Sequence, residues 1–551
     1  MNALEILSWA PLLRAQIEAE VKTRLRSTST AFAVIAILVA SFKWIPDPAS
    51  GGVSMAWKDL AGQPTTSIYN SAYVGASAAI LASLFLSLIG FYLVTGSIRR
   101  DRDSGVGAIL AATPLSKAAY LGGKIAAHAV YLWTIGLVAL LGGLLVFARF
   151  GVGPLEPLAF LLPWLLFVAP ALLFVAAVAV FFDATPGLRG KAGLVIYFFT
   201  WTFGFLLIPG LLSGSMNPER GEEGQVAAPA TPVEVSPPYY DPTAVATVTQ
   251  MLQESTPSVL GEVSLGLQYG MKGLVRVDWP GFRYPPRIFL LRLLNLVWML
   301  IPFGLAYLFF DRFDPARKQG KARQEKKARA VAALDAAAAE MAPKLHLATL
   351  PAVHCQPSAL RAILAEAKLL WDSSGLLRFL LPLAALAAAA PGEAGLPGAA
   401  VLLLLLGPAI AELAARESLA GTWPLILGQP GVPRSTLWWK LAAALVFLGL
   451  LGLPRLLTSL VHPELAAGWL LGLVFIASFA VAAGALTGGG KLFIGVYVAL
   501  WYVALNGAPF ADFAAALSPA PALATSALFA AAGLGFAAIA WVVERRRYSF
   551  A

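Results

Sequence analysis

The stretch RDSGVGAILAATPLSKAAYLGGKIAAHAV at residues 102–130 recurs in altered form as RESLAGTWPLILGQPGVPRSTLWWKLAAALV at residues 416–446. Each copy begins with Arg, an acid and Ser, and then runs through an apolar stretch to a proline, Pro114 or Pro430. A lysine follows each proline after ten residues, and Ala-Ala follows that lysine closely. In this alignment the second copy has two extra residues before its proline. The recurrence predicts an internal duplication.

Two further pairs of segments keep the same order along the chain. LRAQIEAEVK (13–22) and LRAILAEAK (360–368) are amphipathic and precede the first apolar run of each half. Two short loops ending in Gly-Lys, at 185–191 and 487–491, come later in each half. Three matched pairs in one order predict two parallel halves, related by a pseudo-two-fold axis along the membrane normal.

The composition places the chain in a membrane. Of its 551 residues, 58% are hydrophobic and only 13% are charged, whereas a soluble protein has roughly 25% charged residues. This excludes a soluble enzyme, a disordered protein and a DNA-binding module, so we expect no nucleic-acid partner despite the net charge of +10. A single cysteine, Cys355, excludes an internal disulfide, and with only four histidines we expect no metal site.

Apolar runs long enough to cross a bilayer predict an all-α polytopic membrane protein with about twelve transmembrane helices, in two six-helix repeats. The expected spans are 28–45, 72–96, 125–148, 157–182, 192–212, 288–310, 376–390, 398–415, 441–460, 468–486, 492–508 and 522–543.

The distribution of basic residues sets the orientation. With both termini inside, the outside segments hold only Lys58, Arg149, Arg220, Lys272, Arg276 and Arg283. Lys and Arg concentrate in cytoplasmic segments of membrane proteins. We therefore expect a protein of the prokaryotic cytoplasmic (inner) membrane, surrounded by the lipid bilayer, with both termini in the cytoplasm.

The recurring segment has a recognisable physical design. A charged pair at a helix end marks the water boundary, and the apolar residues after it suit a short helix lying in the interface. Pro114 and Pro430 end that helix. Lys124 and Lys440 then mark re-entry into the membrane, as anchors whose ammonium groups reach water. The product is a short helix presented to the cytoplasm twice.

These residues resemble those of the transmembrane subunit of ABC-2-type (type V) ABC exporters. That family carries an acid, Gly-Thr, an apolar run, Thr-Pro-Leu-Ser and then Gly-Lys between its second and third spans. The corresponding residues here are Asp103, Gly105, Thr113, Pro114, Leu115, Ser116, Gly123 and Lys124. The second copy departs from the pattern, because Gly428-Gln429 precedes Pro430 and Trp439 precedes Lys440.

The resemblance covers essentially the whole chain and implies two permease units fused in one polypeptide. The first unit is 1–310, a basic cytoplasmic linker is 311–345, and the second unit is 346–551. Within them the resemblance implies elbow helices at 12–25 and 359–371, coupling segments at 102–116 and 416–430, and an external segment at 213–286.

Alternatives remain open for the soluble parts. The linker is either a solvated, positive-inside flank or a contact for anionic lipid. The external segment is either a lid or dock for an outer partner, or a tolerated insertion. Within it, residues 241–268 predict short amphipathic helices.

The resemblance implies that the inner segments are coupling helices that dock on an ATPase subunit. The implied coupling residues are Asp103, Gly105, Thr113, Pro114, Ser116, Glu417, Gly421 and Pro430. A simpler interpretation is that Asp103 and Glu417 only pair with Arg99 or Arg416.

The chain itself lacks the phosphate-binding motif of an ATPase. Walker A needs G-x-x-x-x-G-K-[ST], and the Gly-Lys pairs at Lys124, Lys191 and Lys491 have Ala118, Thr185 and Ala485 at the first Gly position. We therefore expect no enzyme activity and no cofactor in this chain. Two copies of a cytoplasmic ABC ATPase, with Mg-ATP, are the expected partners.

The implied function is export of an amphiphilic or hydrophobic substrate by alternating access. The second and fifth spans of each half would line the path, with the candidate residues Tyr92, Thr95, Thr200, Thr202, Tyr502 and Asn506. Two alternatives remain, a secondary active transporter and a non-transporting membrane scaffold. A secondary carrier needs ionisable groups near the midplane, which these apolar spans almost lack.

Overall fold

The computed structural model describes residues 3–59, 62–113, 115–213, 237–256, 263–268, 273–313, 358–422, 432–505, 508–517 and 523–548. Helices of the first half are α1 (Ala3–Leu25), α2 (Thr28–Trp44), α3 (Ser71–Val94), α4 (Ser97–Asp103), α5 (Val106–Ala112), α6 (Lys117–Phe150), α7 (Pro157–Pro163), α8 (Ala169–Ala184), α9 (Lys191–Phe199), α10 (Ile208–Leu212), α11 (Val245–Ser255), α12 (Pro286–Val297) and α13 (Leu300–Phe309). Those of the second half are α16 (Ala359–Ser373), α17 (Leu377–Ala388), α18 (Leu396–Ile410), α19 (Arg416–Ala420), α21 (Val432–Ser459), α22 (Pro463–Thr487), α23 (Lys491–Leu505) and α24 (Leu523–Tyr548). π-helical turns at Trp164–Val168 and Thr200–Leu207 join α7 to α8 and α9 to α10.

The prediction of a helical polytopic membrane protein is confirmed. Among the described residues, eight helices are long and apolar enough to cross a membrane, and the number is up to ten if each of two bent helix pairs is one span. The bent pairs are α1 with α2, at 71°, and α16 with α17, at 101°. The helices α18 and α23 are apolar but shorter. A helix thus occupies each of the expected ranges, while the count of crossings by length is eight to ten.

Small residues let the helices of the first half pack closely. On α6, a Cβ at Gly143 would lie 2.6 Å from the Cβ of Ala78 on α3, and a Cβ at Gly142 would overlap the side chain of Ser41 on α2. Glycine at such positions allows helix backbones to approach one another. As a result α3 is buried along nearly its whole length.

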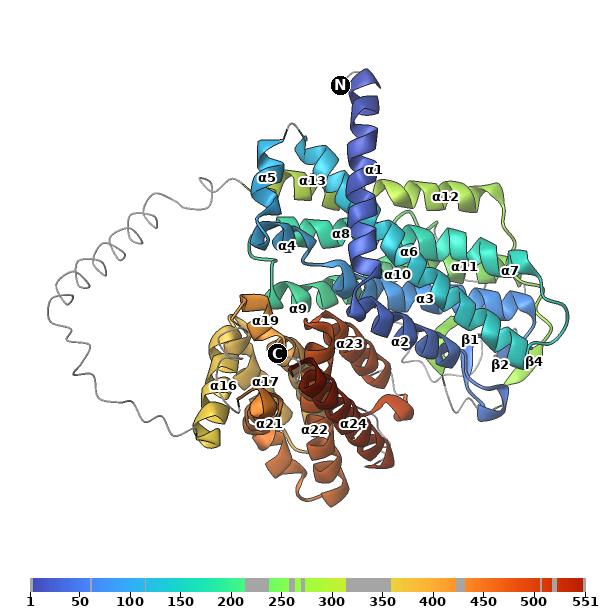
Figure 1. Ribbon diagram of the computed structural model, residues 1–551. Helices are drawn as coiled ribbons and strands as arrows, with labels where there is room; N and C mark the ends of the chain where they lie inside the picture. The colour runs from blue at the N-terminus through green and yellow to red at the C-terminus, as the bar shows by residue number, and fades with distance from the viewer. Residues whose placement is uncertain are drawn as a thin grey trace, which may run out of the picture.

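A small sheet, at the end of the first half far from α4 and α5 (Figure 1), departs from the sequence prediction. Strands β1 (Val53–Lys58), β2 (Pro64–Ser67), β3 (Val263–Gln268) and β4 (Val275–Val277) form it in the order β3-β1-β2-β4. The β2–β4 pair is parallel and the other two pairs are antiparallel. Among the described residues of the range 241–268, which omit 257–262, helix is found only in α11. The end of this range is a strand because it pairs with β1, a partner over 200 residues away.

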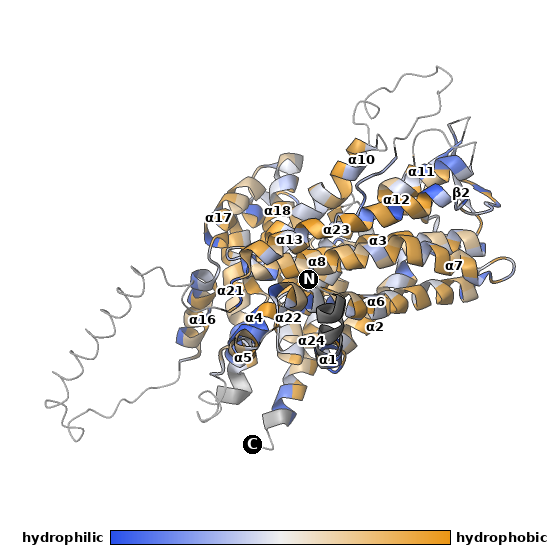
Figure 2. Cartoon of the chain, turned by 90° about the horizontal axis from the view of Figure 1, so that it is seen from above, coloured by the Kyte–Doolittle hydropathy of each residue, from blue (hydrophilic) through white to orange (hydrophobic). Residues whose placement is uncertain are grey.

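The two halves form separate bundles that meet at one end. In Figure 1 most long helices of the first half run across the view, except the upright α1, and those of the second half run mostly downward. The bundles come together near α4, α9 and α19 (Figure 1), and α3 also packs on α23 and α9 on α18. Figure 2 shows hydrophobic residues along the long helices and hydrophilic residues gathered on the sheet and on α4. The junction near α4, α9 and α19 is thus where polar segments of both halves lie close together.

Candidate coupling site and the junction between the halves

Two glycines divide the first inner segment into short helices. Gly96 and Gly105 have φ of +83° and +79°, in the left-handed region that glycine adopts most readily, and they precede α4 and α5. On α5, Ile109 has 68% of its surface exposed. Asp103 is also exposed, and its carboxylate lies 3.3 Å from Arg99 Nε. An exposed pair of this kind contributes little to stability, so Asp103 is accessible to another molecule.

The end of this segment leads directly into α6. The Thr113 hydroxyl donates to the Leu110 carbonyl, and the Ser116 hydroxyl accepts from Ala119 N as the N-cap of α6. Pro114 lies outside the described residues. The expected turn is thus bounded by a local hydrogen bond on one side and a helix cap on the other.

A buried ionic cluster fastens the inner segment to the elbow helix α1. The Glu20 carboxylate on α1 forms three ion pairs. Its oxygens lie 2.9 Å from Arg24 Nε, 2.5 Å from Arg100 Nη2 of α4 and 2.8 Å from Lys124 Nζ of α6. Lys124 also contacts Asp101 of α4 at 2.8 Å. Because Glu20 and Lys124 are both buried, removing one member would leave an uncompensated charge. Three helices are therefore held as one unit.

The second half repeats this arrangement at corresponding positions. Arg416 of α19 lies 2.9 Å from Glu366 of the elbow helix α16. Lys440 of α21 pairs with Glu417 of α19 and donates to the Leu413 carbonyl at 2.8 Å. The ammonium groups of Lys124 and Lys440, assigned from the sequence to membrane re-entry, thus bind buried carboxylates of the inner segments.

The ion pairs correct the alignment of the two copies. Asp101, rather than Asp103, is the counterpart of Glu417, because each pairs with the lysine 23 residues later. In this register Gly105 matches Gly421, which has a φ of +68°, and no insertion is needed. Pro430 matches Pro114 in this register but lies among residues 423–431, outside the described residues.

Two lysines connect the halves reciprocally. Lys191 Nζ, at the start of α9, donates to the Ala409 carbonyl at the end of α18, 2.9 Å away. Lys491 Nζ, at the start of α23, donates to the carbonyl of Thr95, just after α3. Each Gly-Lys loop therefore binds the end of the second span of the other half, and α3 packs on α23 while α18 packs on α9.

Aromatic residues repeat within the fifth spans. The Tyr197 hydroxyl donates to the Ser87 carbonyl, and the Tyr497 hydroxyl donates to the Leu403 carbonyl. The halves differ four residues after Ser87 and Leu403. In the first half the Phe91 ring stacks on the Tyr197 ring with centroids 3.6 Å apart, whereas in the second half Gly407 faces Tyr497. The two halves thus share the hydrogen bond from the fifth-span tyrosine to a second-span carbonyl, but different side chains pack beside it.

Part of the first half is similar to a known protein family. Residues 30–223, which include most of α2 and all of α3 to α10, match the model described as ABC-2 family transporter protein. Residues 30–223, called the ABC-2 region below, are therefore similar to the ABC-2 transporter family. Neither the curated proteins nor the solved structures that were compared contain a match to this chain. The ABC-2 region contains the inner segment of α4 and α5 and ends within the external segment.

Four of the six candidate path residues lie in the ABC-2 region, and their hydroxyl groups have different hydrogen-bond partners. The Tyr92 hydroxyl is buried and donates to the Leu194 carbonyl, and the Thr95 hydroxyl donates to Asp183. Thr200 and Thr202 donate to carbonyls of their own helix. Beyond the ABC-2 region, Tyr502 packs edge-on against Trp201 at 5.0 Å, across the junction. Asn506 lies outside the described residues.

Sequence reasoning missed the residues that hold the inner segments in place. These are Glu20, Arg100 and Asp101 in the first half, with Glu366 and Arg416 in the second half. The available signal was the Ala-Glu-x-Lys shared by the two elbow helices, which contains Glu20 and Glu366. By itself this pattern indicates only a helix, since the partners in the inner segments, Arg100 and Arg416, lie 80 and 50 residues away in the sequence.

Proposed function

We propose that this chain is the transmembrane permease of an ATP-binding cassette exporter, with two permease units fused in one polypeptide. It moves an amphiphilic or hydrophobic substrate by alternating access. Two copies of a separate cytoplasmic ABC ATPase hydrolyse Mg-ATP and drive the motion. The protein lies in the prokaryotic cytoplasmic membrane with both termini inside.

The observation that carries the proposal is the ionic clamp on each inner segment. A segment that transmits force must move with the membrane helices and not bend away from them. Glu20 and Lys124 fasten α4 to α1 and α6, and Glu366 and Lys440 have matching roles in the second half. A push on α4 or α19 would therefore be passed to the elbow helix and to the long helix after it.

The surface of the first inner segment suits a docking partner. Ile109 and Val106 on α5 are 68% and 43% exposed, and Asp103 lies on the adjoining α4. Apolar residues beside an exposed charge suit a protein interface that gains affinity from burial and orientation from charge. The ATPase subunit is the partner that the family match favours.

The reciprocal lysines support a paired mechanism. Each half holds the end of the other half's second span, through Lys191 and Lys491. The proposed motion changes this junction when the ATPase subunits close, so both halves move together.

Co-expression with an adjacent ABC ATPase tests the proposal. The full chain should retain two ATPase copies during purification, and Ile109→Glu should lower that retention at least about tenfold, because it places a charge in an apolar contact. Val152→Glu is the matched control, since Val152 is 55% exposed but follows the end of α6 that is far from α5. Normal ATPase retention by Ile109→Glu would reject the docking role of α5. An ATPase-free chain that transports would favour a secondary carrier, and a complex without transport would favour a scaffold.

A further inference from the structure

A cavity lies at the junction of the two halves. It measures about 80 Å³ and is lined by the ends of the second and fifth spans of both halves. A second cavity of about 410 Å³ shares Gly96, Arg99, Glu412 and Lys491 with it and extends between α4 and the Gly488 loop. The two cavities are thus adjacent on the side of the inner segments.

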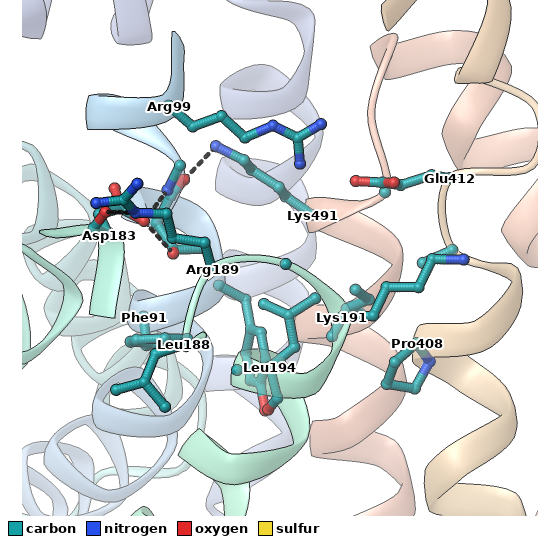
Figure 3. A pocket seen from close by; sticks show the side chains of 18 residues that line it. Phe91, Arg99, Asp183, Leu188, Arg189, Lys191, Leu194, Pro408, Glu412 and Lys491 are labelled. Atoms are coloured by element: carbon teal, nitrogen blue, oxygen red, sulfur yellow. Dashed lines mark hydrogen bonds between the residues drawn. The ribbon is translucent and has the colours of Figure 1, made fainter. Parts of the chain in front are cut away.

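Basic residues outnumber acidic ones in the first cavity. Its lining contains Arg99, Arg189, Lys191 and Lys491, against Asp183 and Glu412. Figure 3 shows the Arg99 side chain extending toward Glu412, while the ammonium group of Lys491, from the other half, is turned toward the first half, where it donates to the Thr95 carbonyl.

Asp183 is already engaged by its own half. Its carboxylate accepts hydrogen bonds from the Thr95 hydroxyl at 2.9 Å and from the backbone N–H groups of Gly96 and Ser97, each at 2.7 Å. Arg189 is engaged as well, because it donates to the carbonyls of Asp183 and Ala184. The charges left to meet a ligand are therefore Arg99, Lys191 and Lys491, with Glu412 as the single opposing group in this lining.

The lysines keep hydrogen-bonding capacity beyond the contacts between the halves. An ammonium group has three donors. Lys491 uses one on the Thr95 carbonyl, and Lys191 uses two, on the Ala409 carbonyl and the Ser373 hydroxyl. Arg99 is half-exposed and its partner Asp103 is on the surface, so its guanidinium can turn to a ligand at small cost.

The other wall of the cavity is apolar. Phe91, Leu194, Pro408 and Ile494 line it, and Figure 3 places Phe91 and Leu194 on the side away from Arg99. Cations on one side and apolar side chains on the other suit a molecule with an anionic head and an apolar body.

We propose that this junction binds the phosphate-type anionic headgroup of an amphiphilic substrate, with Lys191, Lys491 and Arg99 as the donors. The inference rests on the proposed function and specifies its substrate class. An anion bound here contacts lysines of both halves, so its arrival and departure act directly on the hydrogen bonds that join them.

Binding to the purified full chain in neutral detergent tests this inference. The probes are dioctanoyl phosphatidic acid, dioctanoylglycerol, which has the same tails without the phosphate, and inorganic phosphate. Phosphatidic acid should bind at least about tenfold more tightly than either of the others, since charge-assisted hydrogen bonds and apolar contacts both contribute. Equal binding of dioctanoylglycerol would overturn the headgroup site, and equal binding of inorganic phosphate would overturn the amphiphile.

Variants locate the site. Lys491→Gln and Arg99→Gln should each weaken phosphatidic acid binding about tenfold. The control is Arg149→Gln, which also removes one positive charge but lies in the last turn of α6, away from the cavity, and should leave binding unchanged. Because Arg99 is exposed, Arg99→Gln should fold even if Lys491→Gln does not, and the binding measurement on Arg99→Gln then tests the site alone. Unchanged binding in both variants would reject the site. ATPase retention is measured on the same variants, so a chain that keeps its ATPase copies but fails to discriminate the probes refutes only the substrate class.

Discussion

Lys491 of the second half donates a hydrogen bond to the backbone carbonyl of Thr95 in the first half. The two residues are 396 positions apart in the chain. Lys191 makes the reciprocal contact with Ala409. The ends of four membrane helices thus meet at two lysines that come from equivalent loops.

Replacing Lys491 by Met should loosen this junction. The Thr95 carbonyl loses its donor, at a cost of about 1 kcal/mol, so the thermal unfolding temperature in detergent should fall. Lys22→Met is the control, because Lys22 forms an exposed pair with Glu18 within one helix and such pairs contribute little. Equal unfolding temperatures for the two variants would show that the contact contributes nothing.

Replacing Glu20 by Gln should destabilise the first half strongly. Arg24, Arg100 and Lys124 would lose their shared carboxylate, and breaking a buried ion pair costs about 3–5 kcal/mol. The yield of monodisperse protein and its unfolding temperature provide the measurement.

Two matched variants frame the Glu20 result. Glu18→Gln removes an exposed carboxylate two residues away and should be nearly neutral. Glu20→Asp keeps the charge and should recover part of the loss. A Glu20→Gln protein as stable as Glu18→Gln would mean that the cluster does not hold α1 to α4.

A double-mutant cycle on Glu417 and Lys440 should reveal their coupling. Each single neutralisation, Glu417→Gln or Lys440→Met, leaves a buried charge. The double variant should therefore be less destabilised than the sum of the two, with a coupling energy of about 1–3 kcal/mol. The same cycle on Asp101 and Lys124 should give the same sign, whereas purely additive effects in either half would contradict the pairing.

Two glycines of α6 should differ sharply in their tolerance of a side chain. Gly142→Val would overlap Ser41 on α2, while a Cβ at Gly122 meets nothing within 4 Å. We expect Gly142→Val to lower folded yield and unfolding temperature, and Gly122→Val to change the free energy of unfolding by only about 0.5 kcal/mol or less, because valine has a slightly higher helix propensity than glycine. Similar behaviour of both variants would argue against close packing of α2 on α6.

The helices were predictable from the sequence because their signal is local. An apolar run such as 72–96 identifies itself without its neighbours, and α3 spans almost the same residues. The bends after α1 and α16 also follow from local features, since each amphipathic segment changes into an apolar one.

The sheet and the ion pairs were not predictable in the same way. Strand β3 forms through pairing with β1, and its sequence alone is compatible with a helix. The residue pattern aligned Arg-acid-Ser with Arg-acid-Ser and so matched Glu417 to Asp103. Only the three-dimensional contact of Lys124 with Asp101 reveals the correct register.

In the first half Phe91 stacks on Tyr197, whereas in the second half Gly407 lies at the equivalent position beside Tyr497. This difference has a consequence for how the sequence of such a protein can evolve. In an assembly of two identical subunits, every substitution appears twice and alters both sides at once. Here a single codon alters one side alone, so the two sides of the junction can acquire unequal chemistry while the hydrogen bonds of Tyr197 and Tyr497 stay matched.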